Sequence, residues 1–547
     1  MSNNNAVNRR DFLKLTSAAA IGMALNSAGE AAANEGVDGK MERRISGDPY
    51  ELLGKRIVFT NWFYVRPGHF GWYNSMGENV TVRGPEDAWE ASFNRAFLPY
   101  GIKIVTEKAQ RIGPLLEAEK PWEDPNKMDI TTVICHDGKY LAWGNQHYYE
   151  SEDGLNWNRP SLGIVEYNFN RENNFVDLNV GNGTVFFDPN GPDTERFKWV
   201  KEDSISRAEY EEFKKARPDA WHPRCERPDV NMIMCVKGAI SPDGKRWTML
   251  KQPLVVEHSD TQVTCYFDTI LRKYVLYTRN YMVGDRSEKS MDLGFRLWWD
   301  PGRRAIGRSE SEDFRNFPLS ELILEPTPAM APSDLLYTNC RTSIPGAPDH
   351  HVMFPAVWHA AQDDSTSIIM ASSWNGKNWN ILPGEPVFET GIFGNFDGGC
   401  VFTRPNLIEL PNGDWALPYT GYNVPHKYPR QKFKYNTGYA VWPKGRLVAI
   451  EAIEQGEFTT VAIIPPARKL KINAVTKRAG KILVEVLNAQ NQTVKNRSLE
   501  NCIPIIGDQF WTYVKWKDGE DLGVDAGSPI ALRFQMDRAK IFGLEFE

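Results

Sequence analysis

Short runs of β-branched and aromatic residues, separated by polar corners, dominate the middle of the chain. Residues 263–267 and 274–277 form two such runs on either side of Asp268, which predicts two strands joined by a turn. Further along, residues 305–309 form another run that ends in a polar turn followed by Phe314. We expect these pieces to pair as one small antiparallel sheet.

Both pieces recur along the chain. A strand that ends in a polar turn, often Ser-x-Asp-Gly and often followed by tryptophan, begins near Ser151, Ser241, Ser309, Ser373 and Val441. Asp-Gly and Asn-Gly pairs supply the positive φ of a tight hairpin, and the tryptophan packs the return strand. A strand–corner–strand piece precedes each hairpin, with corners near residues 137, 188, 268, 349 and 412.

Five corners alternating with five hairpins predict five copies of a small sheet. The repeat length is roughly 60 to 90 residues, which is enough for four short strands and their loops. Radial repetition of such sheets predicts an all-β fold with a five-bladed β-propeller over residues 123–465. The alternative is a β-sandwich in which the Asp-Gly turns occur by chance.

The segments that flank this repeat have a different pattern of apolar and polar residues. Residues 466–547 alternate apolar and polar positions with period two, which predicts a C-terminal β-sandwich. Residues 34–122 are rich in aromatics without a clear repeat, and we expect an N-terminal extension that packs on the propeller. Its aromatic residues could be core, a cover over the propeller or a platform that stacks on sugars.

Residues 1–33 have the pattern of a targeting segment. Arg9 and Arg10 form a twin-arginine motif, a short apolar run follows, and small residues at 31–33 form a cleavage site. This predicts export in a folded state to the bacterial periplasm or beyond. The apolar run is too short to span a bilayer, and no later run is long enough.

The composition of the chain limits the ligands and partners that we expect. The chain has 547 residues, 64 Lys and Arg against 70 Asp and Glu, and no long basic run, so nucleic acid is not an expected partner. Its seven cysteines form no Cys-x-x-Cys pair, and His222, His350 and His351 lack partners at ligand spacing. We therefore expect no metal and no organic cofactor. Cys225 and Cys235 bracket one loop and could pair in an oxidising compartment.

An insertion at residues 204–236 interrupts the second repeat. Residues 206–216 predict a short polar helix, and residues 221–229 form a loop rich in Trp, His, Arg and Glu. Insertions of this length in a compact repeat are usually functional or disordered, and this composition favours function.

Acidic residues stand at the heads of the predicted inner strands. In a propeller these strands run toward one end of a central funnel, so their heads converge. The second repeat carries Asn182 there, and the others carry Asp129, Asp260, Asp334 and Asp397. Carboxylates that face one funnel raise at least one pKa, which is what a general acid requires while a neighbour stays ionised. For any one of them, the alternative is an Asp that caps a strand turn.

The repeats, the Ser-x-Asp-Gly-x-x-Trp hairpins and the trailing β-sandwich together resemble the five-bladed propeller glycoside hydrolases of the family 32 and family 43 type. Residues 260–262, 304–311, 395–399 and 421–423 are similar to segments of bacterial relatives of these enzymes, and the resemblance covers about residues 120 to 547. It implies an exported enzyme that cleaves a poly- or oligosaccharide, possibly an anionic one, with paired carboxylates.

The chain also departs from these families. Their Asn-Asp-Pro-Asn-Gly, Arg-Asp-Pro and Glu-Cys motifs are absent, and Glu226 follows Cys225 instead of preceding a cysteine. The general acid could therefore be Glu226, Asp334 or Asp397, while Asp129 and Asp260 are expected to belong to the catalytic set with Asp397. Residues expected to bind hydroxyl, carboxylate or sulfate groups of the substrate are Arg279, Arg308, Asn339 and His426, since arginine forks suit anionic sugars. Tyr337 is expected to contact the substrate as well.

Two other functions stay open. A propeller of this kind could bind a glycan without turnover, because a fold does not fix a function. The chain could also be a polysaccharide lyase with His426 or Tyr337 as its base.

Overall fold

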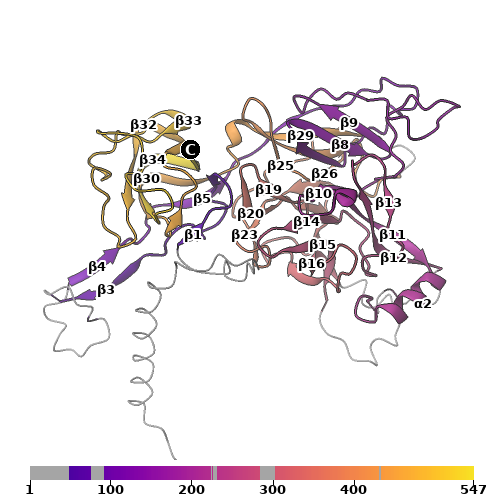
Figure 1. Ribbon diagram of the computed structural model, residues 1–547, viewed down its shortest axis with the longest axis horizontal. Helices are drawn as coiled ribbons and strands as arrows, with labels where there is room; N and C mark the ends of the chain where they lie inside the picture. Colours follow the sequence, from indigo (N-terminus) through magenta and orange to yellow (C-terminus); the bar gives the residue numbers. More distant parts are fainter. Residues whose placement is uncertain are drawn as a thin grey trace, which may run out of the picture. The chain divides into compact units, whose positions relative to one another are not determined.

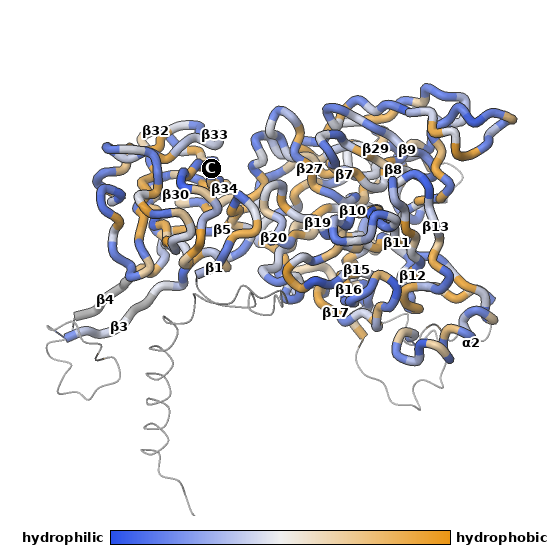
Figure 2. Tube along the Cα trace, in the orientation of Figure 1, coloured by the Kyte–Doolittle hydropathy of each residue, from blue (hydrophilic) through white to orange (hydrophobic). Residues whose placement is uncertain are grey.

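Strands are the main regular elements of the chain that the structure describes. The computed structural model describes residues 49–74, 80, 92–222, 225, 231–283, 302–429 and 433–547 (Figure 1). The predicted all-β class is confirmed, since α2 (Arg207–Ala216) and a few short turns are the helical parts of these ranges. The predicted targeting segment and Glu226 lie outside them. No helix in the described ranges is long and apolar enough to cross a membrane, and hydrophobic stretches are short throughout (Figure 2).

Three small antiparallel sheets follow one another along the chain, each built from strands that are neighbours in the sequence. The first contains β7 (Thr132–His136), β8 (Lys139–Gly144) and β9 (His147–Ser151). The second contains β10 (Thr184–Phe187), β11 (Phe197–Ser206), β12 (Met232–Ser241) and β13 (Thr248–Met249). The third contains β14 (Thr264–Asp268), β15 (Lys273–Met282), β16 (Arg303–Ser311) and β17 (Glu321–Leu324).

The next part of the chain forms two four-stranded sheets that share connecting segments. One contains β18 (Asp334–Leu336), β21 (Ala356–His359), β22 (Thr366–Ile368) and β25 (Phe388–Glu389). The other contains β19 (Arg341–Ile344), β20 (Ala347–Met353), β23 (Ala371–Ser373) and β24 (Trp379–Ile381). β18 leads into β19, β20 into β21 and β22 into β23. At each of these three steps the chain therefore passes from one sheet to the other.

The last sheet of this series takes a strand from far earlier in the chain. Its consecutive strands are β26 (Cys400–Thr403), β27 (Ile408–Glu409), β28 (Trp415–Tyr422) and β29 (Tyr435–Trp442). Its outer strand is β6 (Gln110–Ile112), which pairs antiparallel with β29 between Ile112 and Tyr439. Residues from the predicted N-terminal extension thus complete a sheet of the repeat region.

Hydrogen bonds of threonine side chains join successive sheets at or next to their early strands. The donor–acceptor pairs are Val185 N to Thr132 Oγ1 (3.1 Å), Thr184 Oγ1 to Val263 O (2.6 Å), Thr264 Oγ1 to Asn339 Oδ1 (2.7 Å) and Leu407 N to Thr342 Oγ1 (2.9 Å). Asn406 Nδ2 then donates to Val133 O of β7 at 3.1 Å, which returns to the first sheet. The sheets therefore form a closed circuit.

Three of the predicted hairpins are tight turns with a glycine at positive φ: Gly154 (73°), Gly244 (72°) and Gly376 (70°). In the second and third of these, the following tryptophan folds back on the turn, and Trp247 Nε1 donates to Gly244 O at 3.1 Å. The predicted polar helix is α2, which starts at Ser206 with a capping box to Glu209. Apolar residues of neighbouring sheets, such as Phe186, Val236 and Leu276, share clusters, so the core lies between the sheets.

The C-terminal strands form one six-stranded sheet with partners from elsewhere in the chain. It contains β33 (Asp508–Tyr513), β32 (Leu470–Leu487), β34 (Ala531–Phe546), β30 (Val448–Thr459), β5 (Lys103–Thr106) and β2 (Arg56–Ile57); β30, β32 and β34 lie side by side in Figure 1. A parallel pair joins β1 (Tyr50–Glu51) to β31 (Ile463–Ile464), and β3 (His69–Tyr73) pairs with β4 (Ser92–Ala96). The sheet thus begins before residue 466 and includes strands from the predicted N-terminal extension.

Candidate functional site

A pocket of about 420 Å³ lies where several first strands begin. Its wall combines carboxyl groups, cations, amides and aromatic rings. The lining residues that matter for its chemistry are Asp129, Asn182, Lys201, Glu202, Asp260, Tyr337, Arg404, Tyr422, His426, Phe433 and Tyr435. Asp129, Asn182 and Asp260 are strand-head residues that the sequence predicted to converge, and all three line this pocket.

Asp129 is buried at the floor of the pocket beside Arg404. Its Oδ1 accepts a hydrogen bond from Thr420 Oγ1 at 2.7 Å, and its Oδ2 lies 3.4 Å from Arg404 Nη2. Burial raises the pKa of the Asp129 carboxyl, although Arg404 and the hydroxyl of Thr420 act in the opposite direction. The same guanidinium also donates to Asn182 Oδ1 at 3.2 Å.

Asp260 is partly exposed to the pocket and forms an ion pair with Arg279. The Arg279 side chain is fully buried behind it, and the backbone N–H of Arg279 donates to Ser259 Oγ at 3.1 Å. Burial and the neighbouring Arg304 lower the pKa of Arg279. A guanidinium in contact with Asp260 favours the ionised form of this carboxyl.

Glu202 contributes the third carboxyl group of the pocket, from β11. Its Oε2 is buried and accepts no hydrogen bond from any described residue. Burial raises the pKa of Glu202 to about 7, although Lys201, Arg404 and Arg279 act in the opposite direction. A carboxyl group with this pKa carries its proton for much of the time near neutral pH, as a general acid must.

Tyr337 and His426 meet on the other side of the pocket. Their ring centroids are 4.6 Å apart, and the guanidinium carbons of Arg279 and Arg304 lie 4.5 and 4.8 Å from the Tyr337 ring centre. Burial alone would raise the pKa of Tyr337, but Arg279 and Arg304 outweigh it and lower the pKa. The phenol is therefore easier to ionise than an exposed tyrosine.

A second group of aromatic rings forms a wall of the pocket. Tyr422 and Phe433 stack with centroids 5.4 Å apart and an interplanar angle of 10°, and Tyr435 lies 5.4 Å from Phe433. Such a wall offers apolar faces beside polar groups, which suits the amphipathic faces of a sugar ring.

Two of the predicted carboxyl groups are not among the described residues that line this pocket. Asp397 is buried, and its Oδ2 accepts hydrogen bonds from Arg111 Nη1 at 2.7 Å and Tyr419 OH at 2.9 Å. Asp334 accepts from the Ala331 backbone N–H and lies 2.9 Å from His359 Nδ1. Both carboxyl groups are engaged by side chains of neighbouring strands, and Glu226 lies outside the described residues.

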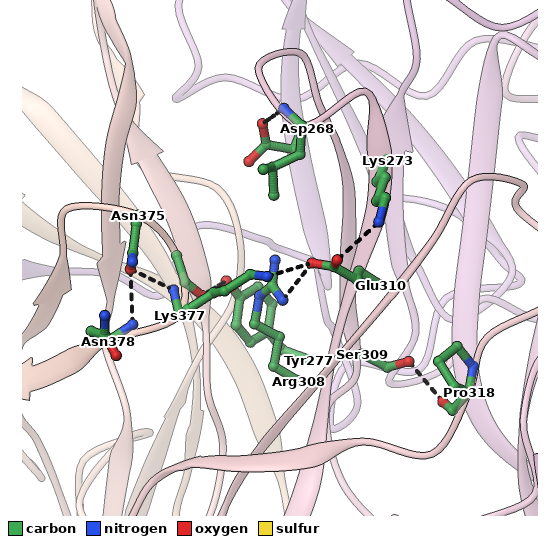
Figure 3. Close-up of polar contacts among 12 residues, drawn as sticks. Asp268, Lys273, Tyr277, Arg308, Ser309, Glu310, Pro318, Asn375, Lys377 and Asn378 are labelled. Carbon is green, nitrogen blue, oxygen red and sulfur yellow. Dashed lines mark hydrogen bonds and ion pairs between the residues drawn. The ribbon is translucent and has the colours of Figure 1, made fainter. Parts of the chain in front are cut away.

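Two predicted substrate-binding residues also have other partners. Asn339 is buried, accepts the hydrogen bond from Thr264 that joins two of the sheets, and donates to Gln262 O at 3.1 Å. Arg308 points to Glu310, with Nη1 2.9 Å from Oε2, beside the ring of Tyr277 (Figure 3). Lys273 and Lys377 reach the same carboxylate at 3.1 and 3.3 Å. Arg308 thus belongs to a charge cluster on the third sheet, and Arg279 acts from behind Asp260.

The described part of the chain offers no group of three or more His, Cys, Asp or Glu side chains arranged to hold a metal ion.

The disulfide considered between Cys225 and Cys235 is not formed. Both cysteines pack in an apolar cluster with Phe213 of α2 and Val256.

Sequence reasoning missed Glu202, Lys201 and Arg404. Lys201 and Glu202 lie in a Val-Lys-Glu-Asp-Ser stretch, and such a polar sequence is typical of a solvent-exposed strand edge. Arg404 follows β26 directly. A rule that also considered polar residues midway along second strands would have included the first two.

Comparison with known proteins identifies no family. No protein-family model matches the chain, and no curated protein matches it. Similar solved structures include one described as "Glycoside hydrolase" (14% identity, TM-score 0.36, 61% of this chain and 91% of that chain). Another is an N-acetylgalactosamine deacetylase from F. plautii (10%, 0.34, 63% and 96%), and a third is the Bombyx mori GH32 beta-fructofuranosidase BmSUC1 (9%, 0.31, 77% and 92%).

Glycoside hydrolases are therefore among the similar solved structures. At these identities and TM-scores the likeness carries no information about the activity of this chain. Membership of the family 32 or family 43 type stays a prediction.

Proposed function

We propose that the protein is a glycoside hydrolase that cleaves O-glycosidic bonds of a poly- or oligosaccharide. The observation that carries this proposal is the pairing of unlike carboxyl groups in one pocket. Glu202 has a pKa of about 7 and Asp260 is ion-paired with Arg279. Two carboxyl groups whose surroundings favour opposite protonation states are what glycoside hydrolysis requires.

In this proposal Glu202 is the general acid. Its proton passes to the glycosidic oxygen as the bond from the anomeric carbon to that oxygen breaks. Asp260, ionised beside Arg279, either accepts a proton from the attacking water or attacks the anomeric carbon itself. The distance between the two carboxyl groups in the substrate complex decides between inversion and retention. Asp129 orients Arg404 at the floor of the pocket.

The remaining walls fit a sugar. Tyr422, Phe433 and Tyr435 supply a stacked aromatic surface, and Asn182 supplies an amide for hydroxyl groups. We further infer that the closed circuit of sheets is a five-bladed β-propeller and that the C-terminal sheet folds as a β-sandwich. The threonine hydrogen bonds and the register shifts in the pairing of β32 with β34 support this architecture. The twin-arginine motif supports action in the periplasm or beyond.

The test is release of reducing ends from plant and algal polysaccharides by the wild-type protein, with product analysis. Glu202→Gln and Asp260→Asn should lose turnover but still bind the same polysaccharide. Glu385→Gln is the matched control, because this exposed carboxylate pairs with Lys108 outside the pocket. Full activity in both pocket variants would reject the site, and binding without turnover by the wild-type protein would indicate a glycan-binding propeller.

One observation favours a second function, that of a polysaccharide lyase. Tyr337 has a lowered pKa, lies in ring contact with His426 and faces two arginines, which is an arrangement suited to abstracting a proton next to a carboxylate. Products with an unsaturated ring, detected by their ultraviolet absorbance, would establish this reaction. Tyr337→Phe should then abolish the product, whereas Glu202→Gln should not.

A further inference from the structure

Together with two arginines that stand behind its wall, the pocket has four cations against three carboxyl groups in the described residues. Lys201 and Arg404 line it, and Arg279 and Arg304 stand behind Asp260 and Tyr337. Against these four cations stand Asp129, Asp260 and Glu202. Since the pKa of Glu202 is about 7, this carboxyl group carries only part of a negative charge near neutral pH, and the four cations are not fully balanced.

Two of the cations have carboxylate partners and two do not. Arg404 faces Asp129, and Arg279 pairs with Asp260. Lys201 and Arg304 form no ion pair with a carboxylate in the described ranges, and Arg304 Nη1 is buried there without a hydrogen-bond acceptor. Partly buried charges without a partner are costly, so an anionic ligand would stabilise them.

Arg404 presents one nitrogen that its neighbours leave unused. Arg404 is only 4% exposed. Its Nε donates a hydrogen bond to Thr420 Oγ1 at 2.8 Å, and its Nη2 donates to Asn182 and Asp129. Nη1 donates to none of the described residues. Thr420 and Asn182 thus fix the guanidinium plane while Nη1 stays available in a residue that lines the pocket.

We propose that the sugar recognised by this pocket carries an anionic group, the carboxylate of a uronic acid or a sulfate ester, which Lys201 Nζ and Arg404 Nη1 bind. This inference rests on the proposed function as far as the ligand is a glycan. Arg279 and Arg304 add a positive field without contacting the anion. A low-dielectric pocket with oriented donors favours such a group over a neutral hydroxymethyl group.

Binding measured without turnover tests this inference separately from the proposed reaction. Isothermal titration calorimetry of the full chain carrying Glu202→Gln would use three probes: oligogalacturonides, sulfated galactan oligosaccharides and neutral galacto-oligosaccharides. We expect one charged probe to bind at least about tenfold more tightly than the neutral one, with a preference that falls as salt is added. Whether the carboxylated or the sulfated probe binds identifies the anion.

Variants of Lys201 complete the design. On the same background, Lys201→Gln should remove most of the tenfold preference and Lys201→Arg should retain it. Lys377→Gln is the matched control, because this lysine pairs with Glu310 away from the pocket. Equal affinity for charged and neutral probes, no binding of any charged probe, or a full preference in Lys201→Gln would overturn the inference. Charged-probe binding by a wild-type protein that releases no reducing ends would instead overturn only the hydrolase.

Discussion

Arg404 and Asp129 are 275 residues apart in the chain, yet Arg404 Nη2 lies 3.4 Å from Asp129 Oδ2 at the floor of the pocket. Both are buried, and the hydroxyl of Thr420 contacts each of them. The contact joins the head of the first sheet to the end of β26 in the last one. The pocket is therefore a product of the closed circuit and of no single segment.

Glu202→Gln should remove the proposed general acid without disturbing the fold. We expect turnover to fall by about 10²- to 10⁴-fold, the usual contribution of a positioned acid. In the wild-type protein kcat/KM should decline above a pH of about 7, as Glu202 loses its proton. A pH–rate profile of kcat/KM checks this, and a flat alkaline limb would assign the acid to another group.

The same carboxyl group should make stability depend on pH. Its pKa is about 7 in the folded state and near 4.5 as a free side chain, so the folded state holds this proton more tightly. The stabilisation is complete below pH 4.5 and is lost as the pH rises through 7. A difference of this size corresponds to on the order of 3 kcal/mol.

Thermal melts of wild-type protein and Glu202→Gln at pH 4.5, 6 and 8 measure this effect. The melting temperature of the variant should rise relative to that of the wild-type protein as the pH increases. Parallel curves would show that Glu202 is solvated.

Asp260→Asn should affect both chemistry and stability. It removes the proposed base and leaves Arg279 buried without its carboxylate partner, so we expect a loss of turnover of about 10²- to 10⁴-fold and a destabilisation of about 3 kcal/mol. Asp397→Asn is the contrasting change. It removes the partner of Arg111 and should lower stability, but turnover per folded molecule should persist. Equal losses of turnover in both would place Asp397 in the catalytic set after all.

Lys198→Met should be strongly destabilising. Lys198 Nζ lies 2.9 Å from Asp188 Oδ2, the two side chains are 1% and 0% exposed, and Tyr274 OH donates to the same oxygen at 2.7 Å. Removing the lysine leaves a buried carboxylate uncompensated, at about 3 to 5 kcal/mol. Equilibrium urea unfolding near neutral pH checks this.

The pH dependence of that variant has a definite sign. Burial alone would raise the pKa of Asp188, but the hydrogen bonds from Lys198 and Tyr274 lower it. Its contribution to stability is therefore present above the pKa of the unfolded chain and is lost as the pH falls. The gap between the wild-type protein and Lys198→Met should shrink as the pH falls below 3.8, the ordinary pKa of an aspartate, and a constant gap would contradict this account.

The sheets were predictable because their signals are local. Gly154, Gly244 and Gly376 needed positive φ, and tryptophans such as Trp247 and Trp379 followed at fixed spacing. The pairing of β6 with β29 left no such signal, because Gln110–Ile112 is too short to show a pattern and its partner lies far away.

The site was predictable only in part. Asp129 and Asp260 stand where the chain enters a first strand, so counting back from the corners reached them. The same counting failed for Asp397, because the partner that engages it, Arg111, comes from the distant strand β6. Glu202 escaped because its raised pKa comes from burial by other sheets, and its neighbours in sequence are polar.

The β6 strand also sets the order in which the protein can be completed. Gln110–Ile112 leaves the ribosome long before Tyr435–Trp442 does, and until then it has no edge to join. A chain that ends anywhere between the two lacks this partner strand, so the circuit of sheets stays open and the pocket lacks its wall at Tyr435.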